Sequence, residues 1–147
     1  MKKTIFYLLF AIMSLNLDAQ NLFKVENNWS NEWHDGGVWK IGSRVNQPII
    51  EIDIISNDNG QTLEGSITYL NEGPIGFRAT MTTPNYYNVE YEWSGEWHEA
   101  EGYWMIGNRN NQNVIELKAQ STDDGKTLIG EMKYDNEGSI GFKAKKI

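Results

Sequence analysis

The chain has 147 residues and no cysteine. This absence excludes disulfide bonds, catalysis by a thiol, zinc sites with cysteine ligands and an acylated lipoprotein cysteine. A folded state without covalent cross-links depends on packing alone. Six Trp, seven Tyr and five Phe residues supply the large buried areas that such packing needs.

Basic residues are also scarce. Lys and Arg number 13 against 20 Asp and Glu, which leaves a formal net charge of −7 at pH 7. Affinity for nucleic acid depends on Lys and Arg that neutralise phosphates, so we expect no nucleic-acid partner. The same argument weakens a role at anionic membrane surfaces.

The apolar run over residues 4–13 is shorter than the roughly 20 residues that span a bilayer. Lys2 and Lys3 precede it, and a polar stretch after it ends at Ala19. This pattern is typical of a secretory signal peptide over residues 1–19; the alternative is an uncleaved interfacial anchor. We therefore expect a secreted or periplasmic protein of residues 20–147 that has no membrane contact after cleavage.

No segment shows helical periodicity over the length that a helix needs. Ile50-Glu51-Ile52-Asp53-Ile54 alternates apolar and acidic residues, the period of a half-buried strand. Similar patterns predict strands over 23–26, 38–41, 63–69 and 75–79. Asp58-Asn59-Gly60 and Asp123-Asp124-Gly125 are predicted as hairpin turns, because neither is followed by the pattern of a calcium loop.

The chain contains one repeat twice. Residues 40–79 align with 105–144 without gaps, and 21 of these 40 positions are identical. We place repeat one at about 22–82 and repeat two at about 86–147, within a single domain because the junction between them is short. His98 lies six positions before Trp104, whereas the matching His34 lies five positions before Trp39. Repeat two therefore has one inserted residue, which predicts a loop within 99–102.

Roughly five short strands per repeat are typical of an all-β sandwich or barrel. A duplicated set of antiparallel strands loses its exposed edges most simply by closing into a barrel. We therefore predict an all-β fold, a single antiparallel barrel.

Three elements recur in both repeats beyond the scaffold. They are Trp29–Trp33 with Trp93–Trp97, Arg44 with Arg109, and Glu72-Gly73 with Glu137-Gly138. An aromatic face packs on the C–H side of a pyranose, while carboxylate, guanidinium and backbone N–H groups bind its hydroxyls. Glycine beside glutamate lets a ligand approach the backbone. These residue types indicate sugar recognition.

Each of these residues also has a structural alternative. Strand alternation directs Trp29 inward, whereas its place at a strand end favours ligand contact. The arginines have surface carboxylates as alternative partners, and the glutamates have turn positions as an alternative role. We assign the remaining recurrent side chains to structure: Trp39 and Trp104 to the core, Trp33 and Trp97 to loop packing, and His34 and His98 to exposed loops.

Four blocks of the sequence resemble the Oscillatoria agardhii agglutinin homologue family of lectins: Val25–Trp29, Gly37–Arg44, Asp58–Gly65 and Glu72–Thr80. The resemblance covers essentially the whole mature chain in both repeats. It implies a single ten-stranded antiparallel barrel in which the two repeats intertwine. It also implies calcium-independent binding of high-mannose N-glycans at their branched α1-3/α1-6 mannose core, with no metal, cofactor or catalytic residue.

The resemblance further implies two sites at opposite ends of the barrel, each built from both repeats. Site one consists of Trp29, Ser30, Arg109, Glu137 and Gly138. Site two consists of Trp93, Ser94, Arg44, Glu72 and Gly73. Family members usually follow the site tryptophan with Gly-Gly and a longer loop containing Ala-Pro. Here the loops are Ser30-Asn31-Glu32 and Ser94-Gly95-Glu96, so we expect a reshaped wall over the sugar and an unchanged fold.

The favoured function is a non-enzymatic, monomeric lectin that cross-links mannose-rich oligosaccharides or glycoproteins through two sites. One alternative is a small secreted glycosidase, although Glu72 and Glu137 fall in different predicted sites and Glu32 and Glu96 lie on loops interpreted as too mobile for catalysis. The other is a barrel with lost or altered sugar specificity that acts in protein binding.

Overall fold

The computed structural model describes residues 22–147, so the predicted signal peptide over residues 1–19 lies outside the described part of the chain. Within it, no helix is long and apolar enough to cross a membrane. The described residues form ten strands: β1 (Leu22–Trp29), β2 (Glu32–Lys40), β3 (Ile49–Ile55), β4 (Thr62–Tyr69), β5 (Ile75–Thr83), β6 (Tyr86–Trp93), β7 (Glu96–Met105), β8 (Val114–Gln120), β9 (Thr127–Tyr134) and β10 (Ile140–Lys146).

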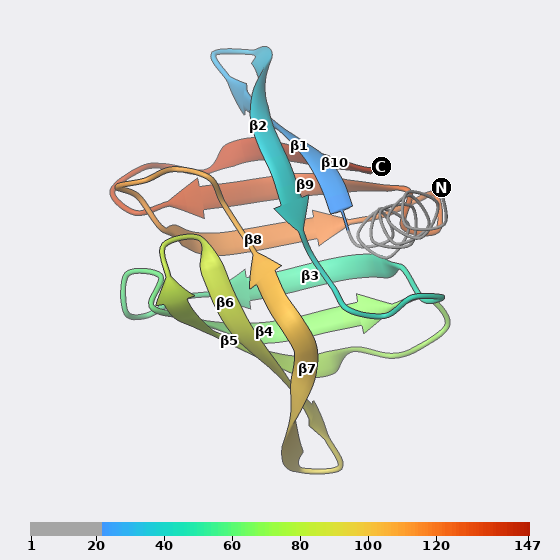
Figure 1. Cartoon of the computed structure of the whole chain (residues 1–147). Helices are drawn as coiled ribbons and strands as arrows, with labels where there is room; N and C mark the ends of the chain where they lie inside the picture. The colour runs from blue at the N-terminus through green and yellow to red at the C-terminus, as the bar shows by residue number, and fades with distance from the viewer. Residues whose placement is uncertain (1–21) are drawn as a thin grey trace, which may run out of the picture.

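The ten strands close into one antiparallel barrel, in the order β1-β10-β9-β8-β3-β4-β5-β6-β7-β2 (Figure 1). Each strand of the ring has a paired neighbour on both sides, although β2 and β7 pair at one position only. The expected all-β barrel of two tandem repeats is confirmed.

The two repeats intertwine. Strands β2, β1, β10, β9 and β8 form one half of the barrel, and β3 to β7 form the other, so each half combines strands of both repeats. The halves join along β3 and β8, where residues 51–55 pair with 116–120. On the opposite side, β2 and β7 share the single pair Lys40 and Met105. The β1–β2 and β6–β7 hairpins project at opposite ends of the barrel (Figure 1).

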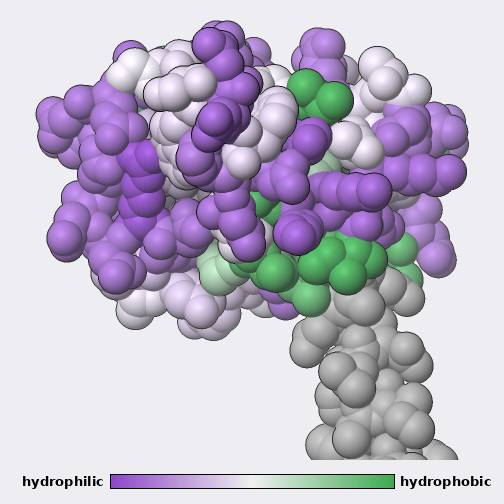
Figure 2. Space-filling model, turned by 90° about the horizontal axis from the view of Figure 1, so that it is seen from above, coloured by the Kyte–Doolittle hydropathy of each residue, from purple (hydrophilic) through white to green (hydrophobic). Residues whose placement is uncertain are grey.

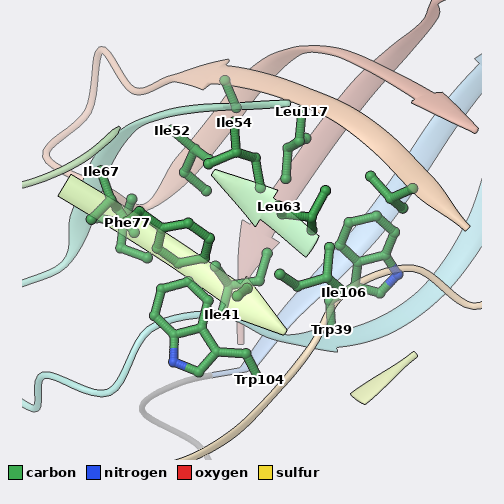
Figure 3. Close-up of a cluster of buried hydrophobic side chains, with 14 of the residues drawn as sticks. Trp39, Ile41, Ile52, Ile54, Leu63, Ile67, Phe77, Trp104, Ile106 and Leu117 are labelled. Carbon is green, nitrogen blue, oxygen red and sulfur yellow. The ribbon is translucent and has the colours of Figure 1, made fainter. Parts of the chain in front are cut away.

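One face of every strand points into a continuous hydrophobic core. Trp39 and Trp104 are 0% and 1% exposed, which confirms their assignment to the core, where the Trp104 ring lies 5.1 Å from that of Phe77 (Figure 3). The predicted inward face of β4 is also confirmed, because Leu63, Ile67 and Tyr69 are at most 1% exposed. Period-two alternation thus set the core correctly.

Two local expectations were wrong. The alternation over residues 50–54 predicted Ile50 on the same buried face as Ile52 and Ile54. Instead, the register between β3 and β4 shifts between Ile49 and Glu51, so Ile49 is buried at 2% exposure and Ile50 is only half-buried. The inserted residue near 99–102 does not form a loop. It lies within β7, where the register against β6 shifts between Asn88 and Glu90, so the strand absorbs the insertion as a bulge.

The predicted turns at Asp58 and Asp123 are confirmed. Asp58 Oδ1 accepts hydrogen bonds from the Thr62 N–H at 2.7 Å and from the Ser56 hydroxyl at 2.8 Å. The Thr62 N–H is the main cause that lowers the pKa of Asp58, and Asp123 is held in the same way by Thr127. These carboxylates close the β3–β4 and β8–β9 hairpins.

Replacement of Trp39 by alanine should lower the free energy of unfolding by about 3–5 kcal/mol, because it removes a fully buried indole and leaves a cavity. Urea denaturation followed by tryptophan fluorescence measures this loss. Trp33→Ala is the matched control, because Trp33 is 44% exposed on β2 and should lose much less. Equal losses in the two variants would contradict the core assignment of Trp39.

Candidate functional site

Each candidate site begins at the tip of a β-hairpin. Trp29 ends β1 and pairs with Glu32 of β2, so only Ser30 and Asn31 form the turn. Both have positive φ, 53° and 66°, as a two-residue hairpin turn of type I′ requires. The expected Trp29–Trp33 loop is therefore a tight turn, and the correction follows from backbone conformation that residue type alone does not reveal.

The second repeat builds the same tip. Trp93 ends β6 and pairs with Glu96 of β7, and the turn consists of Ser94 at φ 53° and Gly95 at φ 82°. Glu32 and Glu96 are thus the first residues of strands in the hydrogen-bonded ladder. The expectation that they lie on mobile loops was wrong.

The neighbours of these tryptophans also lie on strands. Trp33 of β2 is exposed on the outer face, where Lys143 Nζ lies 4.6 Å from its ring centroid. Trp97 of β7 is 38% exposed, and Arg78 Cζ lies 4.1 Å from its ring centroid. The expected loop-packing role is wrong for both, and each instead covers the outside of the barrel beneath a cation.

His34 and His98 are exposed, as expected, but each is part of a strand. The His34 ring lies 4.9 Å from the Trp29 ring, and the His98 ring lies 4.7 Å from the Trp93 ring. Each histidine therefore supports one edge of a site tryptophan. Trp29 and Trp93 themselves are half-buried, so each leaves part of its indole open to solvent.

An arginine, a glutamate and a glutamine form a polar cluster in each half of the barrel. Arg44 Nη1 donates to Glu72 Oε2 at 2.5 Å and to Gln47 Oε1 at 2.9 Å. Its Cζ lies 4.1 Å above the Tyr69 ring. The guanidinium of Arg44 thus lies over an aromatic ring and is bound by the side chains of Glu72 and Gln47.

The second cluster reproduces the first. Arg109 Nη1 donates to Glu137 Oε2 at 2.6 Å and to Gln112 Oε1 at 2.8 Å, and its Cζ lies 4.0 Å above the Tyr134 ring. Glu72 and Glu137 are therefore ion-pair partners and not only turn residues. The structural alternative for the arginines, pairing with surface carboxylates, is confirmed, and these two glutamates are the partners.

The arginines keep both carboxyl groups ionised. The hydrogen bond from Arg44 is the main cause that lowers the pKa of Glu72, and Gln47 adds to it. The hydrogen bond from Arg109 likewise lowers the pKa of Glu137. Both glutamates are therefore acceptors at neutral and mildly acidic pH, and each arginine has further N–H donors besides those bound to glutamate and glutamine. Such a pair of donor and acceptor matches adjacent hydroxyl groups.

The glycines that follow the glutamates lie in open space. A Cβ atom added at Gly73 or at Gly138 would meet no protein atom within 4 Å. Neither glycine has positive φ. Neither packing nor backbone conformation therefore requires glycine at these two positions, which leaves room for an external ligand close to the backbone.

The barrel brings site one together from both repeats. Arg109 of repeat two places Cζ 5.2 Å from the ring centroid of Trp29 in repeat one. Glu137 and Gly138 follow on the β9–β10 loop of the same half of the barrel. Seen from the end that carries the β1–β2 hairpin, the surface is largely hydrophilic, with hydrophobic residues gathered in one area (Figure 2).

Site two is connected through two tyrosines. The Trp93 ring lies 5.5 Å from the Tyr91 ring, and the Tyr91 hydroxyl lies 2.5 Å from the Tyr69 hydroxyl. The guanidinium of Arg44 lies over the Tyr69 ring. Arg44, Gln47 and Tyr69 also help to line a hollow of ≈ 10 Å³, which neither Trp93 nor Glu72 lines.

Sequence reasoning missed the residues that support each arginine: Gln47, Tyr69, Gln112 and Tyr134. Their recurrence was the available signal, because both the glutamine and the tyrosine are identical in the two repeats. Tyr91 gave no such signal, since Asn27 occupies its position in repeat one.

Comparison with known proteins follows these sites. The sequence model of the OAA-family lectin sugar binding domain matches residues 21–82 and again 85–147. Lectin OAA of Planktothrix agardhii is 51% identical over 128 residues, which are 83% of this chain and 96% of that protein. The myxobacterial hemagglutinin of Myxococcus xanthus is 51% identical over 129 residues, 84% of this chain, but the match spans only 48% of the hemagglutinin.

Solved structures agree. The Pseudomonas fluorescens agglutinin superimposes with a TM-score of 0.81 at 48% identity, over 84% of this chain and 98% of that chain. The Myxococcus xanthus hemagglutinin in complex with a3,a6-mannopentaose superimposes with a TM-score of 0.80 at 50% identity, over 84% of this chain and 48% of that chain.

The double variant Gly73→Ala/Gly138→Ala should keep the melting temperature of the wild type within about 2 °C, because the added methyl groups meet no protein atom and the backbone is unstrained. Thermal unfolding by circular dichroism measures this. Gly107→Ala is the destabilised control, because Gly107 has φ 84° and its Cβ would lie 2.8 Å from Val114. A large loss in the double variant would show that the fold, and not a ligand, requires these glycines.

Proposed function

Because the chain belongs to the OAA family of lectins, we propose that it is a non-enzymatic lectin that binds high-mannose glycans at site one and site two. The observation that carries this proposal is the arrangement repeated at each site. A half-buried indole lies at the same end of the barrel as a guanidinium paired with an ionised carboxylate, with open space at a glycine. These groups match the C–H face and the adjacent hydroxyls of a mannose ring.

The mannose assignment rests on chemistry and kinship together. The Myxococcus xanthus hemagglutinin, whose solved complex contains a3,a6-mannopentaose, shares 50% identity with this chain across the barrel. Ser30 and Ser94 lie in the tight turns that follow the site tryptophans, so we expect their hydroxyl groups to contribute to the wall over the sugar. We expect the branched α1-3/α1-6 mannose unit to be the preferred epitope.

The placement of the sites favours cross-linking of glycans. The two hairpins that carry Trp29 and Trp93 project at opposite ends of a rigid barrel (Figure 1). One glycan therefore cannot cover both sites, whereas two glycoproteins can each occupy one. Simultaneous engagement raises the overall affinity by roughly 10²-fold or more over one site. A single chain closes its own barrel, so we propose that the monomer is the active form.

The geometry favours binding over hydrolysis. A glycosidase needs a carboxylic acid whose pKa is raised and a second carboxylate about 5–10 Å away. Arg44 and Arg109 do the opposite, because they lower the pKa of Glu72 and Glu137. Glu72 and Glu137 also lie in different halves of the barrel. We also propose that the protein is exported to the periplasm or the medium, because residues 1–19 have the pattern of a secretory signal peptide.

The double variant Arg44→Ala/Arg109→Ala should lose all measurable binding to a3,a6-mannopentaose, because each site loses its donor and the partner that orients its glutamate. Each ion pair is partly solvent-exposed, so the melting temperature should change little. Isothermal titration calorimetry measures binding. Each single variant should still bind sugar but should no longer agglutinate mannosylated particles. Persistent binding by the double variant would refute the site assignment.

Binding should be independent of metal ions, because the proposed donors and acceptors are protein side chains. Among residues 22–147, no group of three or more His, Asp or Glu side chains is placed to hold a metal ion. Titration with mannopentaose in EDTA should give the same affinity as titration with added calcium. A loss of binding in EDTA that calcium restores would overturn this part of the proposal.

A further inference from the structure

The two sites differ at one buried position directly behind the tryptophan. Asn27 of β1 and Tyr91 of β6 each precede the site tryptophan by two residues. Residues two apart on a strand share a face, so both side chains point into the barrel beneath the indole. They are 1% and 2% exposed. The residues predicted to bind sugar are therefore of the same types in both sites, but the buried side chains beneath the two indoles differ.

In site two, Tyr91 joins the indole to the core. Its ring centroid lies 5.5 Å from Trp93, 6.0 Å from Trp104 and 6.1 Å from Phe77. These tilted and edge-on geometries are the favourable ones for aromatic pairs. Trp93 itself packs against the core cluster. The indole that would carry the sugar therefore has a rigid aromatic support.

Tyr91 also connects the indole to the arginine on the other side of site two. Its hydroxyl lies 2.5 Å from the Tyr69 hydroxyl, and Arg44 lies over the Tyr69 ring. Burial raises the pKa of both hydroxyl groups, so both stay protonated and one donates to the other. Trp93, Tyr91, Tyr69 and Arg44 thus form one continuous chain of contacts across the site.

Site one is connected differently, because Arg109 lies over both the Trp29 ring and the Tyr134 ring. Asn27 presents no ring to Trp29, and its Oδ1 and Nδ2 atoms are buried without a hydrogen-bond partner among residues 22–147. The Trp29 ring centroid lies 4.9 Å from that of His34 and 5.2 Å from Arg109 Cζ. The guanidinium thus lies close to the indole that a sugar would use. Trp29 therefore lacks the tyrosine that supports Trp93, because asparagine stands at this position in repeat one.

From this difference we infer that Tyr91 is a positioning residue that holds Trp93 ready for a sugar, so that site two binds mannose-rich glycans more tightly than site one. The inference rests on the proposed lectin function. A platform that is already ordered loses less conformational freedom on binding. One aromatic contact of this kind corresponds to about twofold to tenfold in affinity. The protein then has one strong and one weak site.

The affinities of the two sites can be measured separately. Arg109→Ala leaves site two intact, and Arg44→Ala leaves site one intact. In calorimetric titrations with a3,a6-mannopentaose, the Arg109→Ala protein should bind about twofold to tenfold more tightly than the Arg44→Ala protein. Equal affinities, or a tighter site one, would overturn the inference while the lectin function stands. Wild-type protein that binds no mannopentaose would instead refute the lectin function and the inference with it.

Tyr91 variants then test the cause. In the Arg109→Ala background, Tyr91→Asn should reduce the affinity to that of site one, whereas Tyr91→Phe keeps the ring stack and should retain most of it. In the Arg44→Ala background, Tyr91→Asn should leave the affinity of site one unchanged. An unchanged site two in Tyr91→Asn, or an equal loss at both sites, would contradict a positioning role for Tyr91.

A measurement without sugar provides an independent check if Tyr91→Asn folds poorly. ¹⁵N relaxation of the indole N–H groups in the wild-type protein reports the order of each tryptophan side chain on the ps–ns timescale. The order parameter should be higher for Trp93 than for Trp29, and Tyr91→Phe should preserve that difference. Equal order parameters in the wild type would show that Tyr91 does not restrict Trp93 and would overturn the inference.

Discussion

The ladder between β1 and β10 is the contact on which both the closed barrel and site one depend. It pairs the first strand of repeat one with the last strand of repeat two, from Phe23 with Lys146 to Asn28 with Gly141. Without it, β1 and β10 would each have an open edge, and Trp29 would have no fixed position relative to Arg109. The equivalent β5–β6 ladder performs the same task for site two. Strand exchange between repeats therefore creates the fold and the candidate sites together.

The sites are surfaces and not cavities, and this shapes the proposed function. Each offers one half-buried indole and one ion-paired arginine whose side chain is partly exposed. A shallow contact of this kind would bury little of a ligand, so we expect a modest affinity for one site under the proposed function. Two such sites on a rigid body recover strength through multivalency, provided that the target presents several glycans. The opposite placement of the hairpins gives that geometry.

Duplication made the two sites similar, and divergence has since changed what lies beneath them. The arginine, glutamine and tyrosine of each polar cluster are identical between repeats, whereas Asn27 and Tyr91 differ. A buried amide that lacks a hydrogen-bond partner costs about 1–3 kcal/mol, and Asn27 finds none within the described part of the chain. The tyrosine replaces that cost with aromatic packing and a hydroxyl contact. Tyr91 therefore both stabilises the fold and orders the tryptophan at site two, whereas Asn27 does neither at site one.

The sequence by itself determined the duplication, the strands, the carboxylate-closed turns and the core tryptophans, because period-two alternation and turn residues act over a few neighbouring positions. It also identified the recurrent Trp, Arg and Glu-Gly groups, although their assignment across the two repeats came from resemblance to known lectins. Tertiary structure alone decided which groups meet, since Trp29 and Arg109 are brought together by a strand order that no local pattern encodes. It also decided the tight turn at Ser30 and Asn31, the bulge in β7 and the aromatic support of Trp93. Those features depend on backbone conformation and on contacts between distant strands, which the order of residues along one strand does not specify.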